Sequence, residues 1–240
     1  MFTPKVFTSF LVLCFLLCFA WANFALSQNT FSELEASEVY SSELAIVNGT
    51  RWYFDNNYKG HPFFYDDELF EGSVTFNGVN FSHLTLTYEL LSNELILVKE
   101  VDTQIRELIL NENFVESFVL IHPVTARQYF FERKKLSGVE GKKYYQVVYP
   151  GETTCYIYHK KVINNRVTGN YMGEYLYEPV IYIKKGDEFK GCTNKRTFLR
   201  LLEDQKKQIR KYMRRNNLSF HGENPEDIAR VLQYYDSLTP

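Results

Sequence analysis

The sequence predicts a mainly β protein: a long antiparallel β-meander over residues 46–190, curved or partly closed, followed by a pair of helices over residues 191–240. Two observations predict this fold class. Short runs of alternating apolar and polar residues recur along the first part of the chain, with turn-forming residues between them. After residue 191 the apolar residues recur instead with the period of an amphipathic helix.

The clearest strand pattern lies in HLTLTYEL (83–90), which puts Leu84, Leu86 and Tyr88 on one face of an extended segment. Before it, Asn77-Gly78 is the dipeptide that best tolerates the positive φ angles of a tight hairpin. Similar runs follow at short spacing, in residues 94–101, 105–110, 114–121, 127–134, 142–149, 153–162 and 177–185. Short connections predict antiparallel neighbours, because a parallel pair needs a longer crossover. Curvature or partial closure would limit the exposed sheet edges.

The C-terminal helices are predicted by two apolar stripes. At 100° per residue, the first stripe holds Phe198, Leu201, Leu202, Ile209, Tyr212 and Met213. The second helix begins near Asn224, a natural N-cap, with Pro225 in the first helical position. The linker between the helices is short, so we expect both to pack on the sheet as part of the same domain.

The N-terminus predicts export. Residues 1–27 combine an early lysine, an apolar run and small residues, which is typical of a cleavable signal peptide. Cleavage after Ala22 and cleavage after Ser27 both fit. A membrane anchor is the alternative, but the apolar run is shorter than the roughly 20 residues that span a bilayer. A polar segment follows over residues 28–45, and no later run is long enough to span, so we expect a mature chain in the periplasm or at the cell surface.

One segment carries a conspicuous charge in a chain whose formal net charge is −2. Residues 192–217 contain nine basic side chains and two acidic ones, most of the basic ones opposite the apolar stripe. The candidate docking face consists of Arg210, Lys211, Arg214 and Arg215. It is either a solvated helix surface or a docking site for acidic headgroups, glycans or a protein partner. Export argues against nucleic acid, the partner that such a stripe would otherwise suggest.

Two cysteines remain after removal of the leader, Cys155 and Cys192. In an oxidising compartment they can form one disulfide, which makes them a candidate pair. The alternative is two separate buried thiols that behave as small apolar side chains.

No motif indicates catalysis, a cofactor or a metal. The chain lacks GxSxG, HExxH, a P-loop and GxGxxG, and its five histidines are scattered. We therefore predict no catalytic, cofactor-binding or metal-binding residue and no cofactor. The acidic run Asp66-Asp67-Glu68, with Asp55 and Glu71 nearby, could hold calcium, although a solvated turn is the simpler interpretation.

Aromatic residues are unusually frequent, with 18 Tyr and 20 Phe. Long β-meanders use aromatic rings for core packing and cross-strand pairs. The alternative is a surface platform of the kind that binds sugars or proteins, for which the region to consider is Tyr144, Tyr145, Tyr156, Tyr158, Tyr175 and Tyr177.

Several stretches together carry a family resemblance: GHPFF (60–64), GSVTFNGVNF (72–81), LTYELLSNELIL (86–97), KKYYQVVYPG (142–151) and the ending NKRTFLRLLEDQKKQIRKYMRRNNLSF…NPEDIARVLQYYDSL. From about Ile46 to Leu238 the chain resembles a family of uncharacterised exported proteins from Bacteroidota. The resemblance implies export and this order of elements. It implies no activity and no functional residue, because none is established for the family. Cys155 and Cys192 depart from the family pattern, so a disulfide would be a local feature.

These observations favour a non-enzymatic exported binding or accessory protein of the cell envelope, whose partner would be an envelope protein, a glycan or a lipid. The first alternative is a carrier for a lipid or other hydrophobic ligand in a cleft of the curved sheet. A carrier requires an apolar sheet face that the helices leave open. The second alternative is an enzyme without recognisable motifs.

Overall fold

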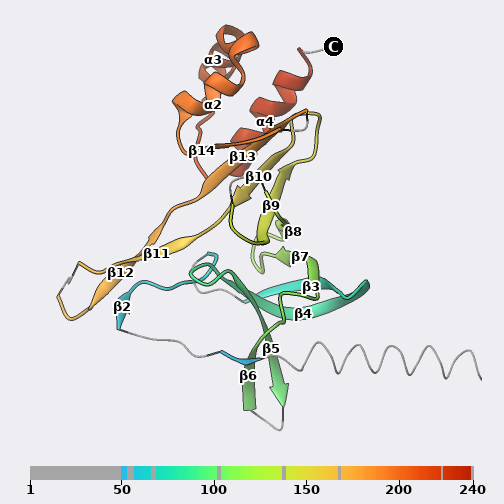
Figure 1. Ribbon diagram of the computed structural model, residues 1–240, viewed down its shortest axis with the longest axis vertical. Coiled ribbons are helices and arrows are strands. Elements are labelled where there is room, and N and C mark those ends of the chain that lie inside the picture. The colour runs from blue at the N-terminus through green and yellow to red at the C-terminus, as the bar shows by residue number, and fades with distance from the viewer. Residues whose placement is uncertain are drawn as a thin grey trace, which may run out of the picture. The chain divides into compact units, whose positions relative to one another are not determined.

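The computed structural model describes residues 50–52, 57–65, 69–101, 104–136, 139–166, 169–186, 188–222 and 224–238 (Figure 1). These residues belong to a single compact unit, Val47–Pro240. The predicted signal peptide, the polar segment 28–45 and four of the acidic residues considered for calcium lie outside the described residues. Those four are Asp55, Asp66, Asp67 and Glu68.

Fourteen strands are described, and they confirm the mainly β, antiparallel fold. Their bounds are β1 Thr50–Arg51, β2 Tyr58–Lys59, β3 Phe70–Phe76, β4 Val79–Glu89, β5 Glu94–Val101, β6 Gln104–Ile109, β7 Val115–Ile121, β8 Gln128–Lys134, β9 Lys143–Tyr149, β10 Cys155–Tyr158, β11 Lys161–Asn164, β12 Gly173–Tyr177, β13 Val180–Lys185 and β14 Glu188–Cys192. Asn77 and Gly78 form the predicted hairpin, with φ angles of 51° and 78° between paired Phe76 and Val79.

Eleven strands form one open sheet in the order β1-β6-β5-β4-β3-β7-β8-β9-β10-β13-β14. The order departs from an uninterrupted meander in three places. β1 pairs with β6 at one end of the sheet. β7 pairs with β3 rather than with its predecessor β6, so β3 is bonded on both edges. β11 and β12 leave the large sheet after β10 and form a three-stranded sheet with β2, which pairs in parallel with β12 (Figure 1).

The core of the large sheet is aromatic. The rings of Phe118 and Phe131, from neighbouring strands β7 and β8, stack with centroids 4.6 Å apart. Tyr88 meets both rings edge-on at 5.3–5.4 Å, and Tyr144 meets the ring of Phe118 edge-on at 5.1 Å. All four side chains are at most 1% exposed. Edge-to-face contacts of this kind add stability beyond the area that they bury.

The predicted first helix is broken into three elements: α2 Lys195–Leu201, the 3-10 turn η1 Glu203–Gln205 and α3 Lys206–Arg215. The break coincides with a polar cluster in which Asp204 accepts from Tyr235 Oη at 2.8 Å and from Lys185 Nζ at 3.2 Å. These bonds tie η1 to β13 and to the last helix, α4 Pro225–Asp236. Although partial burial opposes the effect, the hydrogen bonds from Tyr235 and Lys185 hold the pKa of Asp204 below its usual value.

Pro225 occupies the predicted first position of α4, and Asn224 occupies the predicted N-cap position without forming a side-chain cap. The side chain of Asn224 makes no capping bond to the helix and donates instead to Ser219 Oγ at 3.3 Å. The carboxylate of Asp227, in the first turn, accepts from the amide of Ser219 at 2.8 Å. This bond holds the linker against α4, a position in which a negative charge also complements the helix dipole.

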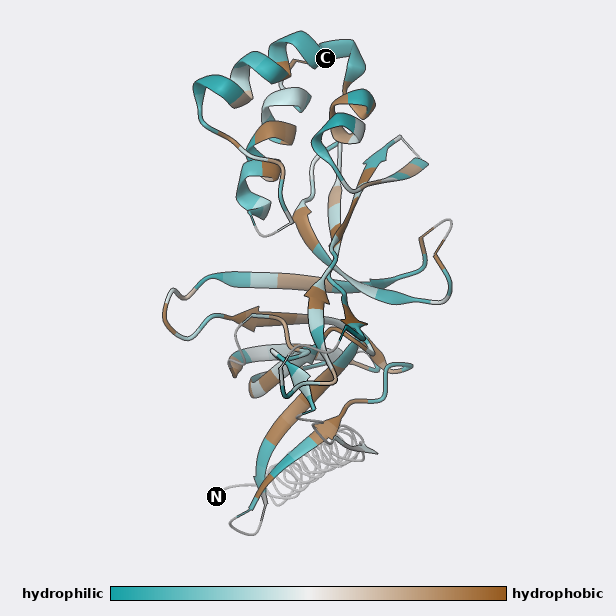
Figure 2. Cartoon of the chain, turned by 90° about the vertical axis from the view of Figure 1, so that its left-hand side faces the viewer, coloured by the Kyte–Doolittle hydropathy of each residue, from teal (hydrophilic) through white to brown (hydrophobic). Residues whose placement is uncertain are grey.

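The apolar stripes of the helices pack on β10, β13 and β14, as predicted. Phe198, Leu202, Ile209 and Met213 share a buried cluster with sheet residues that include Ile157 and Ile183. Along the helices, stretches of hydrophilic residues alternate with shorter hydrophobic ones (Figure 2). The helices therefore cover much of this face of the sheet.

The candidate disulfide is wrong, because Cys155 and Cys192 are both free thiols, buried in the same apolar cluster. Cys155 lies on β10 and pairs with Ile183, whereas Cys192 lies on β14 and pairs with Ile181. Strand β13 separates them, and two strand spacings amount to about 9–10 Å. A disulfide needs Cα atoms about 4.4–6.8 Å apart.

We expect a reducing agent to leave the thermal midpoint of the protein unchanged, because Cys155 and Cys192, the described cysteines, are not bonded to each other. A thiol reagent should label both cysteines in urea and neither in the native state. Burial raises the pKa of both thiols, that of Cys192 to about 12, so the reactive thiolate is scarce as well as inaccessible. A lower thermal midpoint after reduction would contradict this expectation. So would a protein that shows no reactive thiol when it is unfolded in urea without a reducing agent.

Candidate ligand-binding site

A cavity of about 360 Å³ lies where the large sheet meets the segment before β3 and the linker before α4. Gln146 of β9, His159 after β10, Lys161 of β11 and Tyr177 of β12 contribute polar groups to its wall. Its apolar wall is formed by Phe63, Phe64, Leu90 and Pro225. The volume lies in the range of about 300–1,000 Å³ that small-molecule sites occupy.

The strand register positions His159 beside Gln146. Gln146 of β9 pairs with Ile157 of β10, and His159 follows Ile157 by two residues. Side chains two apart on an extended segment point to the same face, so the imidazole and the amide meet on the inner side of the sheet.

His159 is a buried neutral imidazole with both nitrogens occupied. Its Nε2 lies 2.7 Å from Gln146 Oε1, and its Nδ1 lies 2.5 Å from the hydroxyl of Tyr177. With the amide oxygen as acceptor, Nε2 carries the proton and Tyr177 donates to Nδ1. Burial lowers the pKa of His159 to about 3. The relay Tyr177–His159–Gln146 therefore fixes the orientation of all three side chains at neutral pH.

Phe64 forms the aromatic floor of the cavity. Its ring meets His159 edge-on at 4.8 Å, Tyr129 at 5.2 Å and Phe131 at 5.4 Å. The hydroxyl of Tyr129 donates to the hydroxyl of Tyr65 at 2.8 Å, and burial raises the pKa of Tyr129. Tyr129 therefore contributes a neutral hydroxyl to the cavity wall.

Backbone hydrogen bonds hold the segment 61–65 over the sheet. The amide of Phe64 donates to the carbonyl of Tyr88, and the amide of Leu90 donates to the carbonyl of Pro62, each at 2.8 Å. The amide of Lys161 in turn donates to the carbonyl of Leu90 at 3.2 Å. These bonds join β4 and β11 to the segment that carries Phe63 and Phe64, so the cavity wall is built from fixed elements.

The charged part of the wall is basic. Lys161 Nζ donates to the carbonyl of His61 at 2.8 Å and lies 3.4 Å from its Nδ1. The ring of His61 stacks on Phe63 at 6.1 Å. The described residues that line the cavity include one lysine and two histidines. The ammonium group of Lys161 brings a positive charge to this end of the wall.

A second cavity, of about 550 Å³, shares Tyr177 and Gly222 with the first. Lys160, Lys195 and His221 contribute to its wall. Its carboxylate, Glu178, pairs with Lys160 at 3.2 Å. Tyr177 and Gly222 thus lie between two cavities, each of which has at least one lysine in its wall.

The tyrosines considered as a surface platform are divided among separate places. Tyr177 lines the cavity, Tyr175 packs against Tyr58 of β2, and Tyr144 lies in the aromatic core. Tyr145, Tyr156 and Tyr158 lie in a cluster with Tyr182 and Phe189, apart from the cluster beneath the helices. Of these, Tyr145 is fully buried, and the packing against Leu136 covers part of the cluster.

Sequence reasoning missed His61 and His159, which are isolated histidines and carry no spacing signal. Of the acidic residues considered for calcium, Glu71 lies within the described residues. Its Oε1 lies 2.9 Å from Nδ1 of His83. Among the described residues, no three His, Cys, Asp or Glu side chains lie close enough to hold a metal ion. Arg210, Lys211, Arg214 and Arg215 are all exposed on α3.

No protein-family model, curated protein or solved structure matches this chain. Within the part of the chain that the structure describes, no helix is long and apolar enough to cross a membrane. The fold is an open antiparallel sheet with C-terminal helices, and a cavity with aromatic walls lies beside the sheet.

Proposed function

We propose that this protein is an exported, non-enzymatic binding protein of the cell envelope that holds a small organic ligand in the cavity around His159. The observation that carries the proposal is the combination of an aromatic floor with a few fixed polar groups in one cavity of about 360 Å³. Ligand sites combine apolar and aromatic walls with a small number of oriented polar groups in this way.

The ligand that fits these walls has a flat ring and an acidic group. The rings of Phe63 and Phe64 offer apolar surface for a ring in offset or edge-on contact. The positive charge of Lys161, which lies beside His61 in the wall, would attract a carboxylate or a similar anion, and a charge-assisted hydrogen bond is stronger than a neutral one. Helices cover much of the apolar face of β10, β13 and β14, so we do not extend the proposal to a lipid carrier at that place.

The state of His159 favours binding over catalysis. A general base works best when its pKa lies near the operating pH. Burial lowers the pKa of His159 to about 3, and both ring nitrogens are already engaged by Tyr177 and Gln146. The imidazole is therefore suited to orient its neighbours rather than to exchange protons at neutral pH.

Native purification from the cell envelope tests export and ligand together. The purified chain should begin at Asn23 or Gln28, after the leader. Mass spectrometry under native conditions should show an additional small acidic molecule that is released on unfolding. A chain that keeps the leader would refute export, and a purified protein that carries a lipid or only a protein partner would refute this ligand class.

Trp52 provides a direct reporter of binding, because its ring lies 5.1 Å from that of Phe63 in the cavity wall. The chain contains two tryptophans, and the other, Trp21, lies in the leader. We expect 4-hydroxyphenylacetate to bind and to change the fluorescence of Trp52. The neutral amide of the same compound should bind about tenfold more weakly or worse.

Lys161→Gln should weaken binding of that probe at least about tenfold, because a charged donor is lost. Lys160→Gln is the matched control, since the neighbouring lysine pairs with Glu178 at 3.2 Å and does not line this cavity. It should change the affinity less than about twofold. Equal affinities of acid and amide, or equal losses in the two variants, would contradict the assignment of the anion to this end of the cavity.

A further inference from the structure

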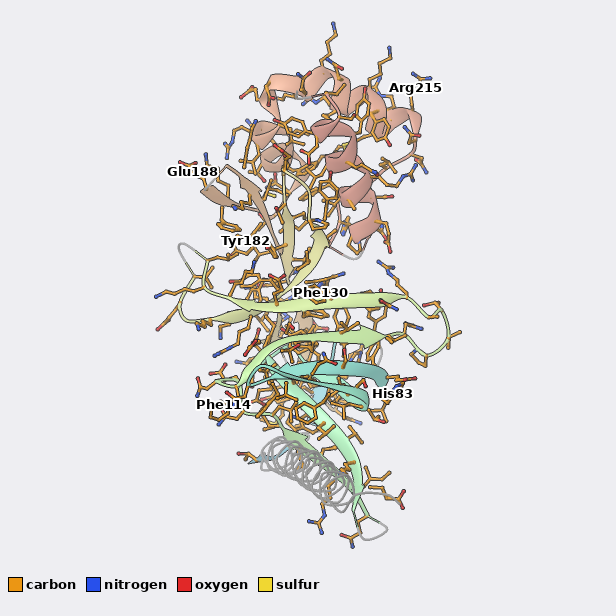
Figure 3. All side chains as sticks on the ribbon, turned by 90° about the vertical axis from the view of Figure 1, so that its right-hand side faces the viewer. His83, Phe114, Phe130, Tyr182, Glu188 and Arg215 are labelled. Carbon is orange, nitrogen blue, oxygen red and sulfur yellow. The ribbon has the colours of Figure 1, made fainter. Side chains whose placement is uncertain are left out.

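The outer side of α3 carries a basic face that consists of Lys207, Arg210, Lys211, Arg214 and Arg215. All five residues are exposed, whereas Ile209 and Met213 on the opposite side of the helix are buried. Arg215 projects away from the helices (Figure 3). Eight residues separate the first cation from the last, which places five positive charges along about 12 Å of helix.

The basic face has no acidic counterpart nearby. Residues 205–222 contain no Asp or Glu. Among the described residues, the ion pair of α3 joins Lys206 to Glu203 at 3.1 Å, and the five residues of the basic face take part in none. Because the like charges are not neutralised within the fold, the face has a strong positive field.

The packing of α3 presents these charges as one fixed surface. Ile209 and Met213 are at most 1% exposed in the cluster that joins the helices to β10, β13 and β14. The ring of Tyr212 stacks on that of Tyr234 in α4, with centroids 4.0 Å apart. The backbone of α3 is thus fixed by packing on two sides. No segment has to fold before the five cations can act together.

We propose that the basic face docks on an anionic phospholipid surface. Charge complementarity supports this partner, since each Lys or Arg close to an anionic leaflet strengthens adsorption roughly fivefold. Within the described residues of α2, α3 and α4, no large apolar side chain is exposed. A protein interface normally buries such anchors at its centre. Binding to a layer of mobile lipid headgroups requires no apolar anchor. The basic face therefore suits a membrane surface better than it suits an acidic protein.

Without apolar anchors, adsorption is electrostatic and peripheral. It requires anionic lipid and weakens as salt screens the charges. This inference does not depend on the ligand cavity, because no residue of the basic face lines that cavity. Lys161→Gln should therefore leave adsorption unchanged, and the two proposals can fail separately.

Sedimentation with vesicles tests the inference on the mature chain. We expect the protein to sediment with vesicles of phosphatidylcholine and phosphatidylglycerol, to stay in solution with phosphatidylcholine alone, and to be released by high salt. Replacing Arg210, Lys211, Arg214 and Arg215 together by Gln should weaken adsorption by at least about a hundredfold. Two double variants, Arg210/Lys211→Gln and Arg214/Arg215→Gln, should each weaken adsorption by at least about tenfold. They replace the fourfold variant in the test if that variant is unstable.

The matched control removes the same number of positive charges elsewhere. Lys59, Lys99, Lys135 and Lys142 are exposed and lie on the sheets or their loops, so their replacement by Gln should weaken adsorption far less than the α3 variant. Circular dichroism verifies that each variant keeps its helices. Equal losses in the two fourfold variants would show a general charge effect and overturn the inference. The inference would also be overturned if the wild-type protein did not sediment with vesicles that contain phosphatidylglycerol. An acidic protein or a glycan would then be the partner of this face.

Discussion

Between pH 6.5 and about 3, the free energy of unfolding of the wild-type protein is expected to fall more steeply than that of a His159→Gln variant, by about 1.4 kcal/mol per pH unit. The cause is the burial of His159, which lowers its pKa to about 3 in the folded state. An unfolded histidine has a pKa of about 6.5. In this window the unfolded chain binds a proton that the folded chain cannot accept.

The sign follows from the depressed folded pKa. Above pH 6.5 both states hold a neutral imidazole and His159 adds no pH dependence. As the pH falls towards 3 the unfolded state gains protons first, so stability is lost, by about 2.7 kcal/mol two units below the unfolded pKa. The groups around the imidazole, Tyr177 from β12 and Gln146 from β9, are neutral and supply no counter-charge. Protonation would also remove the acceptor at Nδ1 that the Tyr177 hydroxyl uses.

At neutral pH the His159→Gln variant should be about 1–3 kcal/mol less stable than the wild type, because the hydroxyl of Tyr177 loses its buried acceptor. Urea unfolding at a series of pH values measures both effects. His221→Gln, the same substitution at an exposed histidine, should keep the wild-type slope. Parallel slopes for the wild type and the His159 variant would show that the imidazole is protonated in the folded state, and the relay would be misassigned.

The local part of the fold could be predicted because its signals are local. The Asn77-Gly78 hairpin follows from residues that tolerate positive φ, and the buried stripe on α3 follows from a period of 3.6 residues. Pairing between distant strands carries no such signal. Strand β7 bonds to β3, some forty residues earlier, rather than to β6, and the alternation of β7 fits either partner equally well.

The candidate site could not be predicted for the same reason. His159 meets Tyr177 and Phe64 only after β12 has left the large sheet and the segment before β3 has folded over it. The helix break at Asp204 also depends on distant partners, Lys185 and Tyr235. The exposure of the basic face, in contrast, could be predicted, because helical phasing alone separates its cations from the apolar stripe.

The second large effect is expected at Phe64. Phe64→Ala should lower the free energy of unfolding by about 3–5 kcal/mol, the usual cost of emptying a buried phenylalanine site. The side chain is 4% exposed, and its ring contacts Phe131, Tyr129 and His159 at centroid distances of 4.8–5.4 Å. No neighbouring element can collapse into the space easily, because the rings of Tyr88 and Phe131 are fixed by contacts with Phe118.

Phe130→Ala is the matched control for this prediction. Phe130 precedes Phe131 on β8 but is 41% exposed, so the same substitution should cost about 1 kcal/mol or less. Urea unfolding of both variants gives the comparison, with the slope of the transition showing whether the native state stays compact. Phe64→Ala should also weaken binding of an aromatic acid that Trp52 fluorescence reports, whereas Phe130→Ala should not. Similar stability losses in the two variants would mean that segment 61–65 is not anchored through Phe64, and that the cavity which it closes lacks a fixed wall.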